Sequence, residues 1–140
     1  MTSNEKKILL AQYRLQQANE TYDEAVYLFA GNKNPRSIIN RLYYSMFYAV
    51  LAILVYEQYT SSKHSGVLSY FNKHFIKKGI FAKEIGRTIN EAFELRLSSD
   101  YGEYVEISKD QIEPFIRKAH VFINTVREYI KKKTSASGGV

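Results

Sequence analysis

The residue that most strongly suggests chemistry in this 140-residue sequence is Arg96, because its position conflicts with its charge. Apolar residues precede it at helical spacing on one face, namely Ile85, Ile89 and Ala92. An unpaired charge on an apolar face is costly, so the guanidinium must find a carboxylate, a carbonyl or an anionic ligand. Two interpretations stay open. Arg96 either pairs with Asp100 or Glu94 or reaches water at a helix end, or it forms an anion or phosphate site with the segment that follows.

A second arginine raises the same question. Arg41 is the only charged residue in positions 37–56, and three tyrosines with hydroxyls that can donate hydrogen bonds follow it, Tyr43, Tyr44 and Tyr48. Arg41 can pair with an acidic residue of the preceding helix, such as Asp23, which leaves the tyrosines in the core with solvated tips. In the other interpretation, Arg41 and Tyr44 contribute to a nucleotide-binding or phosphate-binding site.

His64 is the histidine with the most suggestive surroundings, since Ser62 and Ser65 lie close to it just before an expected helix. A single histidine in such a place is more often a cap or a surface residue than a catalyst, and we keep it as a candidate phosphate contact. No pair of histidines or carboxylates has the spacing of a metal site, no glycine-rich phosphate loop precedes a helix, and no serine nucleophile elbow is present. We therefore expect no metal and no cofactor.

Composition restricts the class of protein. The chain has no cysteine, which excludes disulfide and thiolate chemistry, and it lacks a charged-then-apolar leader, so we expect a cytoplasmic protein. The formal charge of +6 and pI near 9.4 are compatible with a polyanionic partner such as nucleic acid. Part of this charge is the run at 131–133, which complements the dipole at the end of the last expected helix.

The segment "RLYYSMFYAVLAILVY" must position these residues. Fifteen uncharged residues follow Arg41, fewer than the roughly 20 that a membrane-spanning helix needs, and the tyrosines are scattered along the run. The segment therefore predicts a central helix that other helices cover, and no membrane association.

Periodicity and capping signals predict five helices. The first lies between a Thr2–Glu5 capping box and Gly31, and the second begins at Asn34-Pro35. Shorter helices are expected over 67–77 and 82–98, then a loop over 98–108, then a last helix capped by Ser108 and Gln111. These elements predict an all-α, up-and-down bundle in one domain over residues 1–133, with a disordered tail over 134–140.

Three segments together resemble the HEPN domain proteins: "NPRSIINRLYYSMFYAVLAILV", "KHSGVLSYFNKHFIKKGIF" and "ELRLSSDYGEY". The resemblance covers roughly residues 5–132, and its most specific parts are Arg-x-Tyr-Tyr, Lys-His-Ser-Gly and Arg-x-x-x-Asp-Tyr. It implies a helical bundle that forms a homodimer in a prokaryotic cytoplasm, often encoded beside a minimal nucleotidyltransferase. In such pairs the HEPN protein is often the toxin, a metal-independent ribonuclease, and the nucleotidyltransferase is the antitoxin.

The ribonuclease members carry an arginine followed, after four to six residues, by a histidine. Arg96 matches the arginine, but the histidine positions hold Tyr101, Gly102 and Glu103. Cleavage of RNA through its own 2′-hydroxyl needs a base with a pKa near neutrality and a cation to stabilise the phosphorane. Tyrosine ionises near pH 10 and is a poor base, and Asp100 is a weak one.

The sequence therefore favours a HEPN protein with a degenerate ribonuclease motif, which binds a nucleotide, RNA or a partner nucleotidyltransferase. We expect its site at Arg96, Asp100 and Tyr101, with Arg41, Tyr44 and His64 as further candidates. Two alternatives stay open: an active ribonuclease toxin that uses Arg96 with Tyr101 or another unusual base, and a structural partner protein without a ligand.

Overall fold

The computed structural model describes the backbone of residues 1–101 and 106–136, and the side chains of these residues other than Tyr101. The elements in chain order are the helices α1 (Ser3–Ala30), α2 (Pro35–Leu54) and α3 (His64–Phe71), the π-helical turn η1 (Asn72–Ile76), and the helices α4 (Lys83–Tyr101) and α5 (Lys109–Ala136). No strand occurs in this described part of the chain. The predicted all-α bundle is confirmed.

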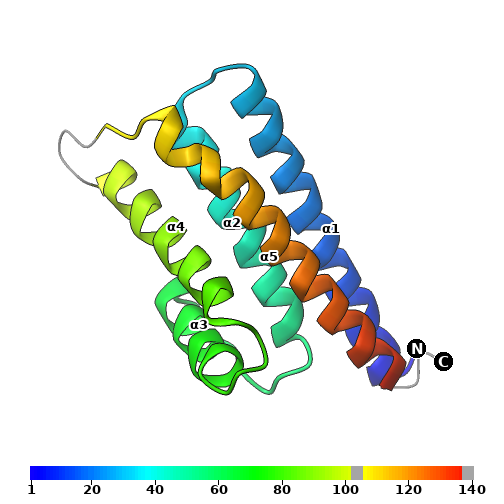
Figure 1. The fold of residues 1–140 in the computed structure, drawn as a ribbon. Helices are drawn as coiled ribbons and strands as arrows, with labels where there is room; N and C mark the ends of the chain where they lie inside the picture. The colour runs from blue at the N-terminus through cyan, green and yellow to red at the C-terminus, as the bar shows by residue number, and fades with distance from the viewer. Residues whose placement is uncertain (102–105, 137–140) are drawn as a thin grey trace.

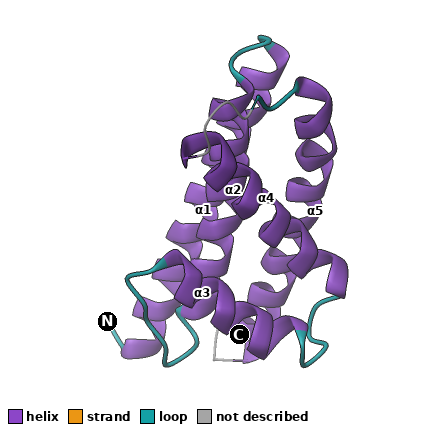
Figure 2. Cartoon of the chain, turned by 90° about the vertical axis from the view of Figure 1, so that its left-hand side faces the viewer, coloured by secondary structure: helices purple, strands orange, loops and turns teal. Residues whose placement is uncertain are grey.

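The helices run up and down the bundle (Figure 1). α1 and α2 form an antiparallel pair, α4 returns along the bundle, and α5 runs beside α1 and α2, so that α1 begins and α5 ends at the same end. α3 and η1 lie at this end as well, below α4, as the rotated view in Figure 2 also shows. This order places the last turns of α4 near the beginning of α2.

α2 is the central helix, as predicted, because it packs against α1, α3, α4 and α5. Its buried side chains include Ile39, Leu42, Met46 and Ile53, each with 1% or less of its surface exposed. By length and composition it could cross a membrane, with a mean hydropathy of 1.3. Two-thirds of that window is nevertheless buried inside the bundle, which explains its apolar character.

Capping residues set the starts of α1, α2 and α5 where the sequence predicted them. The Thr2 hydroxyl accepts a hydrogen bond from Glu5 N, and the Asn34 side chain accepts one from Arg36 N. Ser108 and Gln111 form a reciprocal capping box, since Gln111 Oε1 accepts from Ser108 N and Ser108 Oγ accepts from Gln111 N. α5 therefore begins at Lys109 and includes Pro114 inside the helix.

Three predicted boundaries were wrong. α4 continues to Tyr101, so residues 98–101 are helical and do not belong to a loop. The third helix begins at His64, and residues 72–76 form a π-helical turn, in which Lys77 N donates to Asn72 O. α5 extends to Ala136, three residues past its predicted end.

Candidate phosphate-binding site

Arg96 lies on the inner side of α4, as the apolar spacing predicted, with 13% of its side chain exposed. Its Nε atom is 3.7 Å from Asp100 Oδ2, one helical turn further on, so the predicted ion pair with Asp100 forms. This separation is too long for a hydrogen bond. Among the described residues, Arg96 Nε is the one buried side-chain nitrogen or oxygen without a hydrogen-bond partner.

Two tyrosines of α2 lie against the Arg96 guanidinium. Its carbon is 5.2 Å from the ring centre of Tyr43 and 5.1 Å from that of Tyr44, both within the range of cation–π attraction. Tyr44 also lies 5.5 Å from the guanidinium carbon of Arg41. The Arg-x-Tyr-Tyr segment therefore brings Arg41 and Arg96 to the same aromatic ring.

Arg41 has a different set of partners from the one that the sequence suggested. Its carboxylate neighbour is Glu24 rather than Asp23, at 3.8 Å, and its Nε and Nη2 donate to Asn40 Oδ1 at 3.1 and 2.8 Å. About a third of the side chain stays exposed. Arg41 can therefore reach a ligand in solution while Arg96 lies deeper.

A surface groove of about 520 Å³ runs beside these residues, between α1, α2 and the end of α4. Its lining consists of Leu28, Arg36, Ser37, Asn40, Arg41 and Asp100. Two arginines and one carboxylate give this groove a net positive charge. It therefore offers an anionic ligand a route from solvent toward the Arg96–Asp100 pair.

His64 joins the same cluster from the first turn of α3. Its ring stacks on Phe47 with the ring centres 4.1 Å apart, and its Nδ1 lies 2.9 Å from the Tyr43 hydroxyl. The Lys-His-Ser-Gly turn is held by close packing at Gly66, where a Cβ atom would lie 2.5 Å from Ser61 Oγ. The structure thus places an imidazole beside Arg96, although none of the motif positions 101–103 after Arg96 holds a histidine.

Burial and charge shift the pKa values of two of these groups. Burial raises the pKa of the Tyr43 phenol well above its usual range, against an opposing effect of the nearby Arg96 charge. Burial, and then the Arg96 charge, lower the pKa of His64 below its ordinary value. At neutral pH the Arg96 cation therefore lies beside a neutral phenol and a neutral imidazole.

The structure brings together Arg96, Asp100, Arg41, Tyr44 and His64 from the predicted set. The proposed role of the Tyr101 side chain lies outside the described residues. Sequence reasoning missed the Tyr43–His64 hydrogen bond and the stacking of His64 on Phe47. The sequence signals for these contacts were the two motifs Arg-x-Tyr-Tyr and Lys-His-Ser-Gly. Their spacing along the chain could not show that they meet in the fold.

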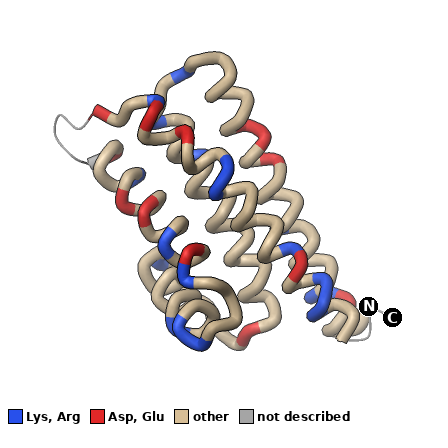
Figure 3. The backbone as a smooth tube through the Cα atoms, in the orientation of Figure 1, with Lys and Arg blue, Asp and Glu red and all other residues tan. Residues whose placement is uncertain are grey.

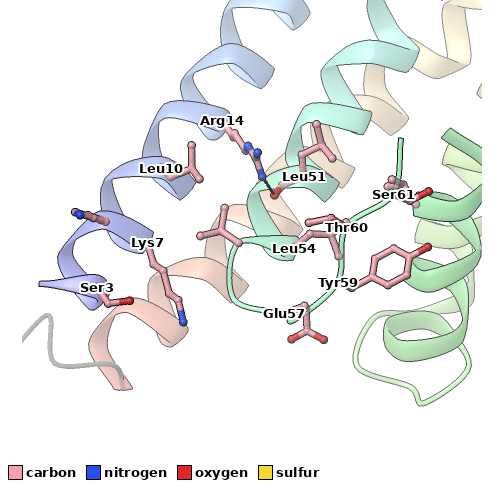
Figure 4. Close-up of a pocket in the computed structure, with 13 residues that line it drawn as sticks. Ser3, Lys7, Leu10, Arg14, Leu51, Leu54, Glu57, Tyr59, Thr60 and Ser61 are labelled. Atoms are coloured by element: carbon pink, nitrogen blue, oxygen red, sulfur yellow. Dashed lines mark hydrogen bonds between the residues drawn. The ribbon is translucent and has the colours of Figure 1, made fainter. Parts of the chain in front are cut away.

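A larger cleft, of about 570 Å³, lies between the beginning of α1 and the end of α2 (Figure 4). Lys7 and Arg14 point toward it, and apolar residues such as Leu51 and Leu54 also line it. The Arg14 guanidinium donates to Leu51 O at 2.9 Å, one of the last carbonyls of α2, which have no partner within the helix. Arg14 is therefore accounted for as a helix cap, whereas the Nε atom of Arg96 has no such partner.

Basic residues are also frequent where α3 and η1 meet α4 (Figure 3). Lys73, Lys77, Lys78 and Lys83 come from this part of the chain. They add positive potential to this end of the molecule, in the manner of proteins that attract polyanions.

Fold and site together define an all-helical bundle protein with a buried arginine between α2 and α4. The comparisons with known proteins agree with this class and make it specific. The HEPN domain model matches residues 11–129, so the chain belongs to the HEPN domain family.

Relatives cover nearly the whole chain. A UPF0332 protein of Thermotoga maritima is 40% identical over 128 residues, which are 91% of this chain and 96% of the relative. A Methanocaldococcus jannaschii protein named "Putative toxin MJ0142" is 37% identical over 134 residues, 96% of this chain and 86% of the relative. A second protein of that organism, "Putative toxin MJ0605", is 29% identical over 115 residues, 82% of this chain and 84% of the relative. The chain is therefore a HEPN domain protein related to proteins named as toxins.

Proposed function

We propose that this protein is the HEPN half of a toxin–antitoxin-like pair and that it binds a phosphate group of RNA or of a nucleotide at Arg96. The names of the two archaeal relatives support the toxin part of the proposal. The observation that carries the binding part is the buried Arg96 Nε–H group without a hydrogen-bond partner.

The physical argument starts from the unsatisfied donor. A buried N–H group without an acceptor costs free energy, and Asp100 at 3.7 Å is too far away to supply the hydrogen bond. A phosphate oxygen would supply the missing acceptor, and the negative charge of the phosphate would be attracted to Arg96 and to the partly exposed Arg41. Arginine suits this role because its planar fork matches phosphate geometry.

An active metal-independent ribonuclease is the second candidate, and one observation favours it. His64 supplies an imidazole beside Arg96, so the site contains both residue types that the family's ribonucleases use. We also propose that the protein forms a homodimer, for which the exposed Tyr13 and Tyr27 of α1 offer apolar surface. Its second proposed partner is a nucleotidyltransferase in the cytoplasm.

The test is Arg96→Met, which keeps the apolar stem and removes the charge. We expect affinity for a short single-stranded RNA, measured by fluorescence anisotropy in EDTA, to fall about ten- to hundredfold, since a hydrogen bond to a charged group contributes about 1.5–3 kcal/mol. The urea midpoint should stay level or rise, because ionic groups on apolar faces are often replaced without loss.

Arg87→Met is the matched control, because Arg87 lies on the same helix but is exposed and pairs with Glu84 at 2.9 Å. It should leave RNA affinity unchanged. An Arg96→Met protein with wild-type affinity and a lowered urea midpoint would mean that Arg96 is only a structural ion pair with Asp100.

A further inference from the structure

The His64 ring is fixed on one face and at one nitrogen. One face stacks on Phe47 at an interplanar angle of 16°, and the Tyr44 ring meets it edge-on with the ring centres 5.5 Å apart. Nδ1 is hydrogen-bonded to the Tyr43 hydroxyl. These contacts leave the imidazole little freedom, so its chemical role depends on which nitrogen carries the proton.

The surroundings of Tyr43 determine the direction of that hydrogen bond. Tyr43 is fully buried, and its hydroxyl has one hydrogen-bond partner among the described residues, His64 Nδ1. If Nδ1 carried the proton, the phenol proton would point to no acceptor. Since burial also keeps the phenol protonated, the Tyr43 O–H group donates to Nδ1. The neutral His64 ring therefore carries its proton on Nε2.

Nε2 is the nitrogen that is left for a ligand. It makes no hydrogen bond within the described chain, and His64 is only half-buried. Arg96 lies against the same two tyrosine rings that contact His64. The Nε2–H group and the guanidinium are thus two hydrogen-bond donors at one aromatic cluster.

We propose that His64 Nε2–H and Arg96 together bind one phosphate group, and that Tyr43 is the positioning residue that keeps His64 a donor. This inference rests on the proposed function and specifies it: the imidazole binds a phosphate oxygen and does not take the proton of a ribose 2′-hydroxyl. Its ligand is a phosphate ester, either within an RNA strand or on a mononucleotide.

The pH dependence of binding distinguishes a His64 that donates a hydrogen bond from a His64 that acts as a base. His64 faces Tyr43, Tyr44 and Phe47 from α2 and Arg96 from α4, and Asp100 partly neutralises Arg96. A protonated imidazole still donates from Nε2, whereas it can no longer act as a base. Phosphate binding should therefore persist or strengthen as the pH falls through the pKa of His64.

The first experiment needs no substitution. Long-range ¹H–¹⁵N correlation spectra of the wild-type protein at pH 8 should show His64 as the Nε2–H tautomer, and Tyr43→Phe should increase exchange with the other tautomer. A wild-type His64 found as the Nδ1–H tautomer would overturn the inference, because Nε2 would then be an acceptor.

The second experiment measures affinity for a short single-stranded RNA, AMP and inorganic phosphate. His64→Gln keeps an amide donor near the position of Nε2 and should stay within about threefold of wild type, whereas His64→Leu should lose about tenfold or more. His120→Leu is the control, since His120 is exposed on α5 and bonds to Asn124. If affinity for RNA alone is lost, the ligand is a phosphate within an RNA strand. If affinities for AMP and inorganic phosphate fall equally, the ligand is an isolated phosphate group.

The outcomes separate this inference from the function on which it rests. If Arg96→Met weakens binding but His64→Leu does not, the inference fails and the proposed function stands. If wild-type protein binds none of the three probes, both fail. If both His64 variants abolish metal-independent RNA cleavage and leave binding intact, His64 is a base and the inference is wrong.

Discussion

Protonation of His64 should destabilise the folded protein, because burial and the Arg96 charge lower its pKa in the native state. An unfolded chain binds the proton near pH 6.5, whereas the folded chain binds it only at lower pH. Between these two pH values the unfolded state holds more protons, so stability rises with pH through this window. The stabilising effect is complete above about pH 6.5 and is lost as the pH falls toward the folded-state pKa.

Linkage sets an upper limit on the size of this effect. One proton of difference between the two states gives a slope of at most about 1.4 kcal/mol per pH unit. The measured slope should be smaller, because His64 is only half-buried and water screens the Arg96 charge. The slope belongs to His64 alone only after the contribution of all other groups has been subtracted.

The assay is urea unfolding at half-unit steps from pH 8 to pH 5, for wild type and for His64→Gln, which cannot titrate. The unfolding free energy of the wild type minus that of His64→Gln should fall as the pH falls below about 6.5. Arg96→Met should reduce this dependence but keep part of it, since burial is the larger cause of the shift. Parallel curves for wild type and His64→Gln would refute the assignment of His64 to a buried, cation-facing position.

Three further substitutions test the fold and the motif. Phe47→Asp places a charge at a residue that is only 6% exposed, so circular dichroism and gel filtration should show unfolding or lost assembly. A folded variant with wild-type behaviour would contradict the central-helix assignment. Gly86→Ala brings a Cβ atom to 2.9 Å from Ile76 Cγ1, and urea unfolding should show a loss of about 1–3 kcal/mol, whereas an unchanged midpoint would mean that η1 gives way freely. Tyr101→His restores Arg, four residues, His, and should produce RNA cleavage in EDTA; an inactive variant that binds RNA would mean that more than this residue has been lost.

Hydrophobic periodicity and capping residues predicted most of the fold. The uncharged run after Arg41 could only be accommodated as a covered helix, and Asn34 and Ser108 fixed helix starts through local hydrogen bonds. The end of α4 was mispredicted because residues 98–103 contain serine, aspartate and glycine, which favour turns. The ion pair between Arg96 and Asp100, one turn apart, accompanies the continued helix there.

The candidate site was predicted only in part, for a physical reason. Arg96 and Asp100 are near in sequence, so their contact follows from helical spacing. Tyr43 and His64 are 21 residues apart and meet only because the segment between α2 and α3 folds back along α2. No periodicity within either helix contains that information, so the hydrogen bond that sets the role of His64 required the three-dimensional structure.

The most direct measurement of the central claim is an NMR titration of the Arg96 side chain with a short single-stranded RNA. The Nε–H group of Arg96 is buried and has no hydrogen-bond partner among the described residues, so its resonance should shift strongly as a phosphate oxygen becomes its acceptor, while that of the exposed Arg87 should hardly move. The account predicts that the Arg96 shift saturates together with RNA binding. RNA that binds the protein while the Arg96 Nε–H resonance stays unchanged would contradict the account, because the phosphate would then be bound elsewhere.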